Sequence, residues 1–375
     1  MAGVRSSVFG EAPWLFGQRL DLWLFGGSAA LSLGLLLSGY ALGISRGDSP
    51  EWVWLLCVLG VDVAHVWSTL YRVYLDPVER RRRPWLYGGA PLLCYVAGVA
   101  LHAVSSLTFW RALAYLALFH FVRQQVGWLK LYHRRAPATS RFDLALDTLT
   151  LYGCMLYPVL FWHAHLPRRF AWFVQGDFVS GGLPWGALSD GLAPLYVGLL
   201  IAFGLRSAQR FVRGDAHAGV VLLVLSTAAC WAAGILLTDA DYAFTVTNVL
   251  IHGIPYLGLT VLYGRARGPE VPGSLLARVM RAGVPLALLV LLGLAFAEEW
   301  LWDRWVWHER PWLFGEGGDL GAVALSALVP LLSLPQTTHY ALDGFIWRKR
   351  GNPDLGRLLM GGAAGLSAER APERP

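Results

Sequence analysis

Long apolar runs, separated by short polar connections, follow one another along almost the whole chain. A helix needs about 20 mostly apolar residues to cross a bilayer, so each run of that length predicts one crossing. The connections are too short to hold a sizeable soluble domain. We therefore predict an all-α, polytopic integral membrane helix bundle. The ten predicted transmembrane helices span residues 23–44, 52–74, 86–107, 110–132, 143–163, 191–212, 218–238, 241–263, 279–300 and 322–346.

The composition agrees with a chain whose solvent is lipid. The hydrophobic fraction is 55%, and only 15% of the 375 residues are charged, whereas about a quarter of the residues in a soluble domain are charged. The net charge of +6 would suggest a nucleic-acid partner for a soluble protein. Here the basic residues lie at helix ends, so we interpret them as an orientation signal and expect no nucleic-acid partner.

The basic residues gather in alternate connections, as the positive-inside rule requires of cytoplasmic loops. The clearest groups are residues 80–83 after the second helix, Arg134 and Arg135 after the fourth, and residues 348–350 after the tenth. Even-numbered helices are therefore predicted to run from outside to inside, with both termini in the cytoplasm. We expect a multi-pass protein of a bacterial inner membrane.

Three parts follow from this pattern. Residues 1–22 form a cytoplasmic or interfacial N-terminal segment, in which no cleaved signal peptide is predicted because a short apolar core followed by a cleavage site is lacking. Residues 23–347 form the bundle, and residues 348–375 form a basic, disordered cytoplasmic tail.

Four histidines inside predicted helices are the strongest candidates for chemistry, because an ionisable group in a bilayer is costly unless it is paired or hydrated. All four lie on even-numbered helices, and they precede the basic residues that end those helices by 7 to 13 positions. At about 1.5 Å of rise per residue, their depths agree within roughly 9 Å. They are expected to meet in one layer. The four are His65, His120, His252 and His339.

Each of these histidines has a polar neighbour one helical turn away, on the same helix face. A metal-bound histidine needs such a neighbour, since its second ring nitrogen must be held by a carboxylate, amide or carbonyl. Several imidazoles around an open position suit iron that activates oxygen. Two alternatives stay open, namely a haem held by two of the histidines and histidines that are only hydrogen-bonded packing residues. The neighbours are Asp62, Gln124, Asn248, and, for His339, Gln336 and Asp343.

Four further polar residues lie near the predicted layer. Arg72 and Arg123 are candidates for holding an anionic head group, although long basic side chains also extend to lipid phosphates. Asp147 and Tyr340 are candidate polar groups of the bundle interior. The sequence has no phosphate-binding loop, no dinucleotide-binding glycine pattern and no His-Glu-x-x-His, so ATP hydrolysis, bound NAD and zincin proteolysis have no support.

With single histidines at positions 65, 120, 252 and 339 on separate helices, the chain resembles polytopic membrane oxygenases that hold iron with histidines. The bacterial β-carotene-cleaving membrane oxygenases are the most similar of these. The clustered histidine boxes of fatty-acid desaturases and alkane hydroxylases are missing. The resemblance implies iron-dependent oxidation of a lipid-soluble substrate.

Three functions are consistent with these residues. The preferred hypothesis is a non-haem iron oxidoreductase that acts on a lipid, isoprenoid or carotenoid and draws electrons from an external donor. The alternative is a proton-coupled transporter that uses the same polar residues as a relay, since Pro255 and Pro335 are able to break helices at mid-depth, as transporters require. A haem-binding electron carrier is a third possibility.

Overall fold

The computed structural model describes residues 14–135, 139–348, 352 and 354–356. Helices make up 79% of the described residues, and no strand occurs among them. The prediction of an all-α fold is therefore confirmed. Within the described part of the chain, eight helices are long and apolar enough to cross a membrane, which supports a helical, multi-pass membrane bundle.

Most of these eight spans are composite, because turns of α-helix alternate with wider π-helical turns. The first combines α1 (Gln18–Asp21), η1 (Leu22–Gly27) and α2 (Ser28–Ala41), and the second combines α3 (Glu51–Val53), η2 (Trp54–Val63), α4 (Ala64–Trp67) and η3 (Leu70–Tyr74). Three are plain: α6 (Pro84–Val104), α8 (Arg141–Ala164) and α9 (Trp185–Arg213). The sixth span joins α10 (Ala218–Trp231) to η4 (Ala232–Leu236). The seventh consists of α11 (Asp241–Phe244), η5 (Thr245–Val249), α12 (Leu250–Arg267) and η6 (Gly268–Glu270). The eighth joins α14 (Val284–Trp302) to η7 (Asp303–Trp307).

The two remaining predicted crossings are helical, but they differ from the eight. The helix α7 (Ser106–Arg135) is long enough but carries more charged residues. The predicted helix 322–346 is divided at Ser333 into α16 (Ala322–Leu332) and α17 (Leu334–Ile346). Pro335 at the start of α17 has no N–H to donate, which explains a break at this point.

Three short helices lie outside the spans: α5 (Pro77–Arg82), α13 (Leu275–Arg281) and α15 (Pro311–Phe314). The predicted start of the ninth crossing at residue 279 is wrong, because α13 is a separate element. Gly283 follows it with a φ of +98°, a conformation that glycine adopts easily, and α14 begins one residue later.

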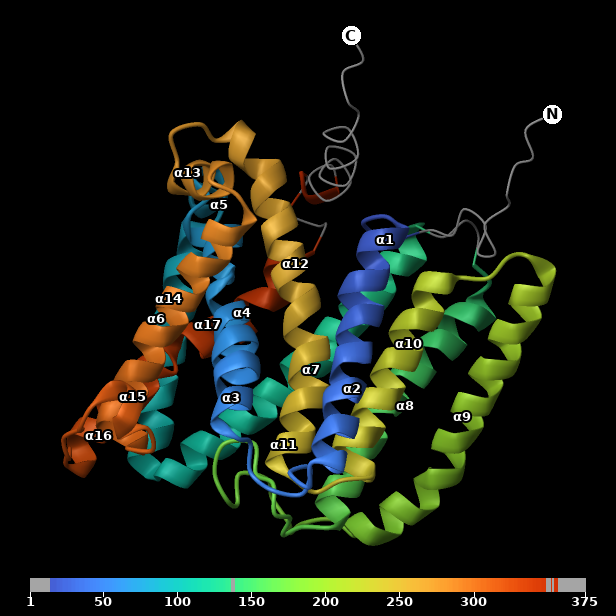
Figure 1. Cartoon of the computed structure of the whole chain (residues 1–375), viewed down its shortest axis with the longest axis horizontal. Coiled ribbons are helices and arrows are strands. Elements are labelled where there is room, and N and C mark those ends of the chain that lie inside the picture. The colour runs from blue at the N-terminus through green and yellow to red at the C-terminus, as the bar shows by residue number, and fades with distance from the viewer. Residues whose placement is uncertain (1–13, 136–138, 349–351, 353, 357–375) are drawn as a thin grey trace. The chain divides into compact units, whose positions relative to one another are not determined.

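The chain divides into two compact units. Unit 1 comprises residues 1–50, 121–170 and 179–255, and unit 2 comprises residues 51–120, 171–178 and 256–375. In unit 1, α8 packs along both α9 and α10; in unit 2, α6 packs against α16 and α17, and α14 packs against α4 (Figure 1). The helices α7 and α12 each begin in one unit and end in the other.

Part of the predicted C-terminal tail packs on unit 2. The side chain of Asn352 is fully buried and accepts a hydrogen bond of 2.9 Å from Arg72 Nη2. Arg82 pairs with Asp354 at 2.7 Å, and Leu355 lies against Tyr263. The rest of the predicted tail after Arg348, like residues 1–13 of the predicted N-terminal segment, lies outside the described residues.

Close packing in unit 1 depends on a glycine of α2. A methyl group at Gly39 would lie 2.3 Å from a ring carbon of Tyr242, whereas one at Gly34 on the same helix would meet nothing within 4 Å. The Tyr242 ring is unable to move away easily, because it is fully buried and its hydroxyl donates to the Leu35 carbonyl at 2.6 Å.

We expect Gly39→Ala to lower the free energy of unfolding by about 1–3 kcal/mol, the usual cost of overpacking a core. The matched variant Gly34→Ala should unfold at the same temperature as the parent or slightly higher, because alanine favours helix by up to about 1 kcal/mol over glycine. Thermal unfolding of the detergent-purified variants measures both. Equal unfolding temperatures for the two would contradict this packing.

Candidate metal centre

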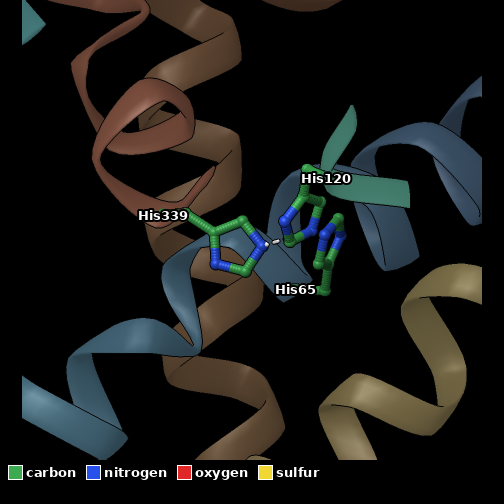
Figure 2. A group of neighbouring side chains, drawn as sticks. All are labelled: His65, His120 and His339. Carbon is green, nitrogen blue, oxygen red and sulfur yellow. Dashed lines mark hydrogen bonds between the residues drawn. The ribbon is translucent and has the colours of Figure 1, made fainter. Parts of the chain in front are cut away.

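Three of the predicted histidines lie together inside unit 2 (Figure 2). His65 comes from α4, His120 from α7 and His339 from α17. One ring nitrogen of each lies within 4.8 Å of the others. The exposed fractions of the residues are 0%, 2% and 0%, so bulk solvent does not reach the group. These three residues are called the histidine triad below.

Local irregularities of the helices position two of the triad residues. His65 occupies a short α-helical stretch with the π-helical segments η2 and η3 on either side. Its carbonyl accepts hydrogen bonds from both the backbone N–H and the hydroxyl of Ser68, at 3.1 and 2.6 Å. His339 follows the break at Ser333. Wide turns and breaks of this kind are frequent at functional sites, because they turn a side chain away from the regular helical register.

The spacing of His120 and His339 suits a metal ion. Nε2 of His120 and Nε2 of His339 are 3.1 Å apart (Figure 2). Two nitrogens bound at about 2.0–2.1 Å to one metal lie roughly 2.9–3.3 Å apart when the angle between the bonds is 90–109°. The observed separation falls within that interval. The same separation also fits a hydrogen bond between the two rings, which holds the pair in place without a metal.

The second nitrogen of each ring faces an oxygen. Nδ1 of His339 lies 2.7 Å from the hydroxyl of Thr69, at hydrogen-bonding distance. Nδ1 of His120 lies 3.7 Å from Asp343, and Nδ1 of His65 lies 3.6 Å from Asp62. In metal-binding histidines, a hydrogen bond of the kind that His339 makes holds the ring in place and selects the tautomer. The carboxylates of Asp343 and Asp62 lie near their rings at distances longer than a hydrogen bond. The arrangement leaves Nε2 of His120 and Nε2 of His339, which face each other, as the nitrogens that are suited to bind a metal.

Aromatic and polar side chains enclose the triad. The Tyr340 ring stacks on His120 with centroids 4.6 Å apart, and its hydroxyl accepts a hydrogen bond of 2.8 Å from Gln336. Tyr256 donates to Asp343 at 2.9 Å and accepts from Trp347 at 3.1 Å. Tyr256 thus holds one oxygen of the Asp343 carboxylate, and the other oxygen lies nearer to His120.

Two of the expected neighbours have different partners from those predicted. Asp343 was expected to hold His339, but the structure places it beside His120, because the turn after His339 points its side chain toward α7. Gln336 was expected beside His339 and instead bonds to Tyr340. Asp62 is the expected neighbour of His65.

The fourth predicted ligand, His252, belongs to unit 1. Its ring stacks on Phe121 with centroids 3.7 Å apart and an interplanar angle of 7°. Gln124, expected to hold His120, donates to the backbone carbonyl of His252 at 3.4 Å. Asn248, expected to hold His252, donates to Thr247 at 3.0 Å. Binding of a metal by His252 stays a prediction.

The other predicted residues have protein partners. Arg72 is buried, pairs with Glu79 at 3.1 Å and donates to the Ile346 carbonyl at 2.7 Å. Arg123 donates to the Tyr152 hydroxyl at 3.3 Å, and Asp147 pairs with His133 at 2.9 Å. Arg72 therefore stabilises unit 2 from within.

Two residues of the site were missed in the sequence. Thr69 lies four positions after His65, and Tyr256 lies four positions after His252. Both spacings would have placed them on the same helix faces as the histidines. A hydroxyl is a weaker signal of function in a membrane helix than an ionisable group, since it is able to bond to its own backbone.

No protein-family model matches the chain, and neither a curated protein nor a solved structure matches it. The chemistry of the site therefore has to be inferred from its own residues.

The contact between Thr69 and His339 yields a prediction. We expect Thr69→Val to weaken metal binding by about 10–100-fold, the usual effect of removing a group that holds a metal ligand. Thr337→Val is the matched control, because the Thr337 hydroxyl bonds to the Ser333 carbonyl at 3.0 Å on the same helix as His339. Titration of the purified, metal-stripped variants with Fe²⁺ measures the affinities. Equal affinities for the two variants would exclude this role of Thr69.

Proposed function

We propose that the chain is a membrane-embedded oxidoreductase in which the histidine triad binds an iron ion and a lipid-soluble molecule is oxidised. The observation that carries the proposal is the meeting of three buried histidines from distant segments, each with an oxygen facing its Nδ1. Buried imidazoles without a function would be costly to keep inside a membrane bundle.

The donor set favours iron among the common metals. Its ligands are neutral imidazoles, with the carboxylates of Asp62 and Asp343 close behind them. The described cysteines lie outside the triad, and soft metals prefer thiolates. Iron bound by a few nitrogen and oxygen ligands supplies oxygen activation at its open coordination positions.

The residues around the triad have separate roles in this proposal. Thr69 and Asp343 hold the rings of His339 and His120 in the orientation that binds the ion. Tyr256 keeps the Asp343 carboxylate beside His120. Burial of the triad keeps the site dry, which limits side reactions with water.

The substrate in this proposal is a membrane lipid, isoprenoid or carotenoid that enters from the bilayer between helices. An external donor supplies the electrons. We also propose that the chain crosses a bacterial inner membrane about ten times, with both termini in the cytoplasm. The alternating basic connections, together with the helical counterparts of all ten predicted segments, support this topology.

One observation favours the transporter as a second candidate. The break at Ser333 between α16 and α17 lies six residues before His339, and transporters often place broken helices beside their binding sites. A haem between His120 and His339 is disfavoured. Axial ligands lie on opposite sides of the iron, roughly 4 Å apart for bonds of about 2 Å, whereas these two nitrogens are 3.1 Å apart.

The decisive experiment is metal analysis by mass spectrometry, combined with oxygen consumption in the presence of isoprenoid lipids. We expect about one iron per chain in the parent, and loss of both iron and oxygen consumption in His65→Ala, His120→Ala and His339→Ala. His165→Ala, outside the triad, is the control. The variant His252→Ala decides the number of ligands: loss of iron supports four histidines, and full retention reduces the site to the triad.

Failure of this experiment would take a recognisable form. If the parent contains no metal after gentle purification and reconstitution with Fe²⁺, the metal proposal fails. Proton-driven uptake of a solute into vesicles that contain the parent protein would then support the transporter, provided that replacing Asp62 or Asp343 abolishes this uptake.

The proposed topology is tested separately. A fluorescent reporter that folds only in the cytoplasm, fused after Pro375, should be bright, and the same reporter fused in the segment between α8 and α9 should be dark. The opposite result at either position would overturn the proposed orientation.

A further inference from the structure

A second feature of unit 2 is a cavity of about 890 Å³ that lies apart from the histidine triad. It is formed by the end of α6, the start of α7, the segment after α14 and the start of α16. Small-molecule sites typically measure about 300–1,000 Å³. The cavity is therefore large enough for the head group of a lipid and the first part of its tail.

One wall of the cavity is aromatic. Trp110 and Trp307 line it, with ring centroids 5.4 Å apart and an interplanar angle of 37°. Behind them, Trp302 stacks on Trp307 at 5.6 Å, and Phe173 lies 5.5 Å from Trp110. Such flat, rigid surfaces are suited to contact a planar ring, because aromatic rings gain from stacked or tilted contacts.

The cavity also presents groups that form hydrogen bonds. Nδ1 of His102 lies 3.1 Å from the hydroxyl of Ser326, and both residues line the cavity. Gln175, His308 and Asp319 line it as well. Each polar group in a groove must be paired or hydrated, so a groove that contacts only lipid tails is expected to contain few of them.

The charges around the cavity narrow the class of ligand. Among the residues that the structure describes, no lysine or arginine lines the cavity, whereas the acidic Asp319 does. A phosphate head group is usually held by basic side chains, and the Asp319 carboxylate would repel it. The lining therefore favours a neutral head group with oxygen atoms.

The cavity connects to the triad through packed side chains rather than through open space. Trp110 and Val329 belong to an apolar cluster that also contains Tyr340, and Tyr340 stacks on His120. Trp110 and His120 are ten residues apart on α7, which corresponds to roughly 15 Å along the helix. A molecule in the cavity would therefore lie close to the triad without touching it.

We propose that this cavity binds a lipid of the quinone type, with a flat, neutral, oxygen-substituted ring on an apolar tail. The ring lies against Trp110 and Trp307, and its oxygen atoms bond to the polar group that includes His102 and Ser326. The tail follows the apolar lining residues Leu325 and Val329. This proposal stands on residues other than the triad and does not require a bound metal.

The test is binding of decylubiquinone to the full-length protein in detergent, measured by isothermal titration calorimetry with a micelle blank. We expect saturable binding to one site. 1-Decanol, which has a tail but no ring, should fail to compete. Equal competition by 1-decanol would mean that the cavity takes up any apolar chain, and would overturn the proposal.

Two pairs of variants locate the site. Ala322 and Ala324 are both exposed on α16, but only Ala322 lines the cavity. Ala322→Trp should therefore abolish binding, and Ala324→Trp should leave it unchanged. Ser326→Ala should weaken binding by about tenfold, the effect of losing one hydrogen bond. Ser226→Ala is its control, because Ser226 also bonds to the carbonyl four residues earlier but lies in unit 1.

The two proposals fail independently. His339→Ala should bind decylubiquinone as the parent does even if it has lost its metal. Binding that disappears in His339→Ala and persists in Ala322→Trp would place the quinone at the triad, and would overturn the assignment of this cavity.

Discussion

The need to pair every polar group buried in an apolar bundle governs the rest of this structure. In lipid, an unpaired donor or ionisable group loses its hydration without compensation, so it must find a partner within the protein. At the histidine triad, His339 contacts both the Thr69 hydroxyl and His120 Nε2 at hydrogen-bonding distance, Tyr256 donates to Asp343, and the Asp62 and Asp343 carboxylates lie near His65 and His120. Because the triad, Tyr256 and Asp343 come from α4, α7, α12 and α17, their contacts also hold those helices together within unit 2.

Departures from regular α-helix bring the triad together. A straight helix would present His65 in a register set only by its neighbours in sequence, but the wide turns of η2 and η3 shift that register on both sides of it. The break at Ser333 does the same for His339. Wide turns and breaks sacrifice regular backbone hydrogen bonds, and such irregularity is usually retained where it positions a functional side chain.

Unit 2 contains a second buried polar network beside the triad. Arg72, two residues into η3, pairs with Glu79 and bonds to Asn352, so it links the helix of His65 to the segment that follows α17. Its guanidinium also lies over the Tyr263 ring at 4.6 Å. Removing one member of such a network leaves an uncompensated buried charge. Arg72 thus anchors the two helices that carry His65 and His339, and its contact with an anionic head group stays a prediction.

The apolar runs, their length and the position of the basic residues were sufficient to predict an all-helical membrane protein and to select four histidines, of which His65, His120 and His339 lie together in the structure. This worked because hydropathy and the cost of buried charge depend on residue type and position along the chain. The sequence was not sufficient to predict which side chains these histidines contact. Thr69 holds His339, Asp343 faces His120, and His252 stacks on Phe121 in unit 1. The sequence determines how deep a residue lies along its helix. The rotation of each helix about its axis depends on how the helices pack in three dimensions, and this rotation decides which neighbour each side chain contacts. The same reason applies to the cavity, whose walls come from segments more than 200 residues apart.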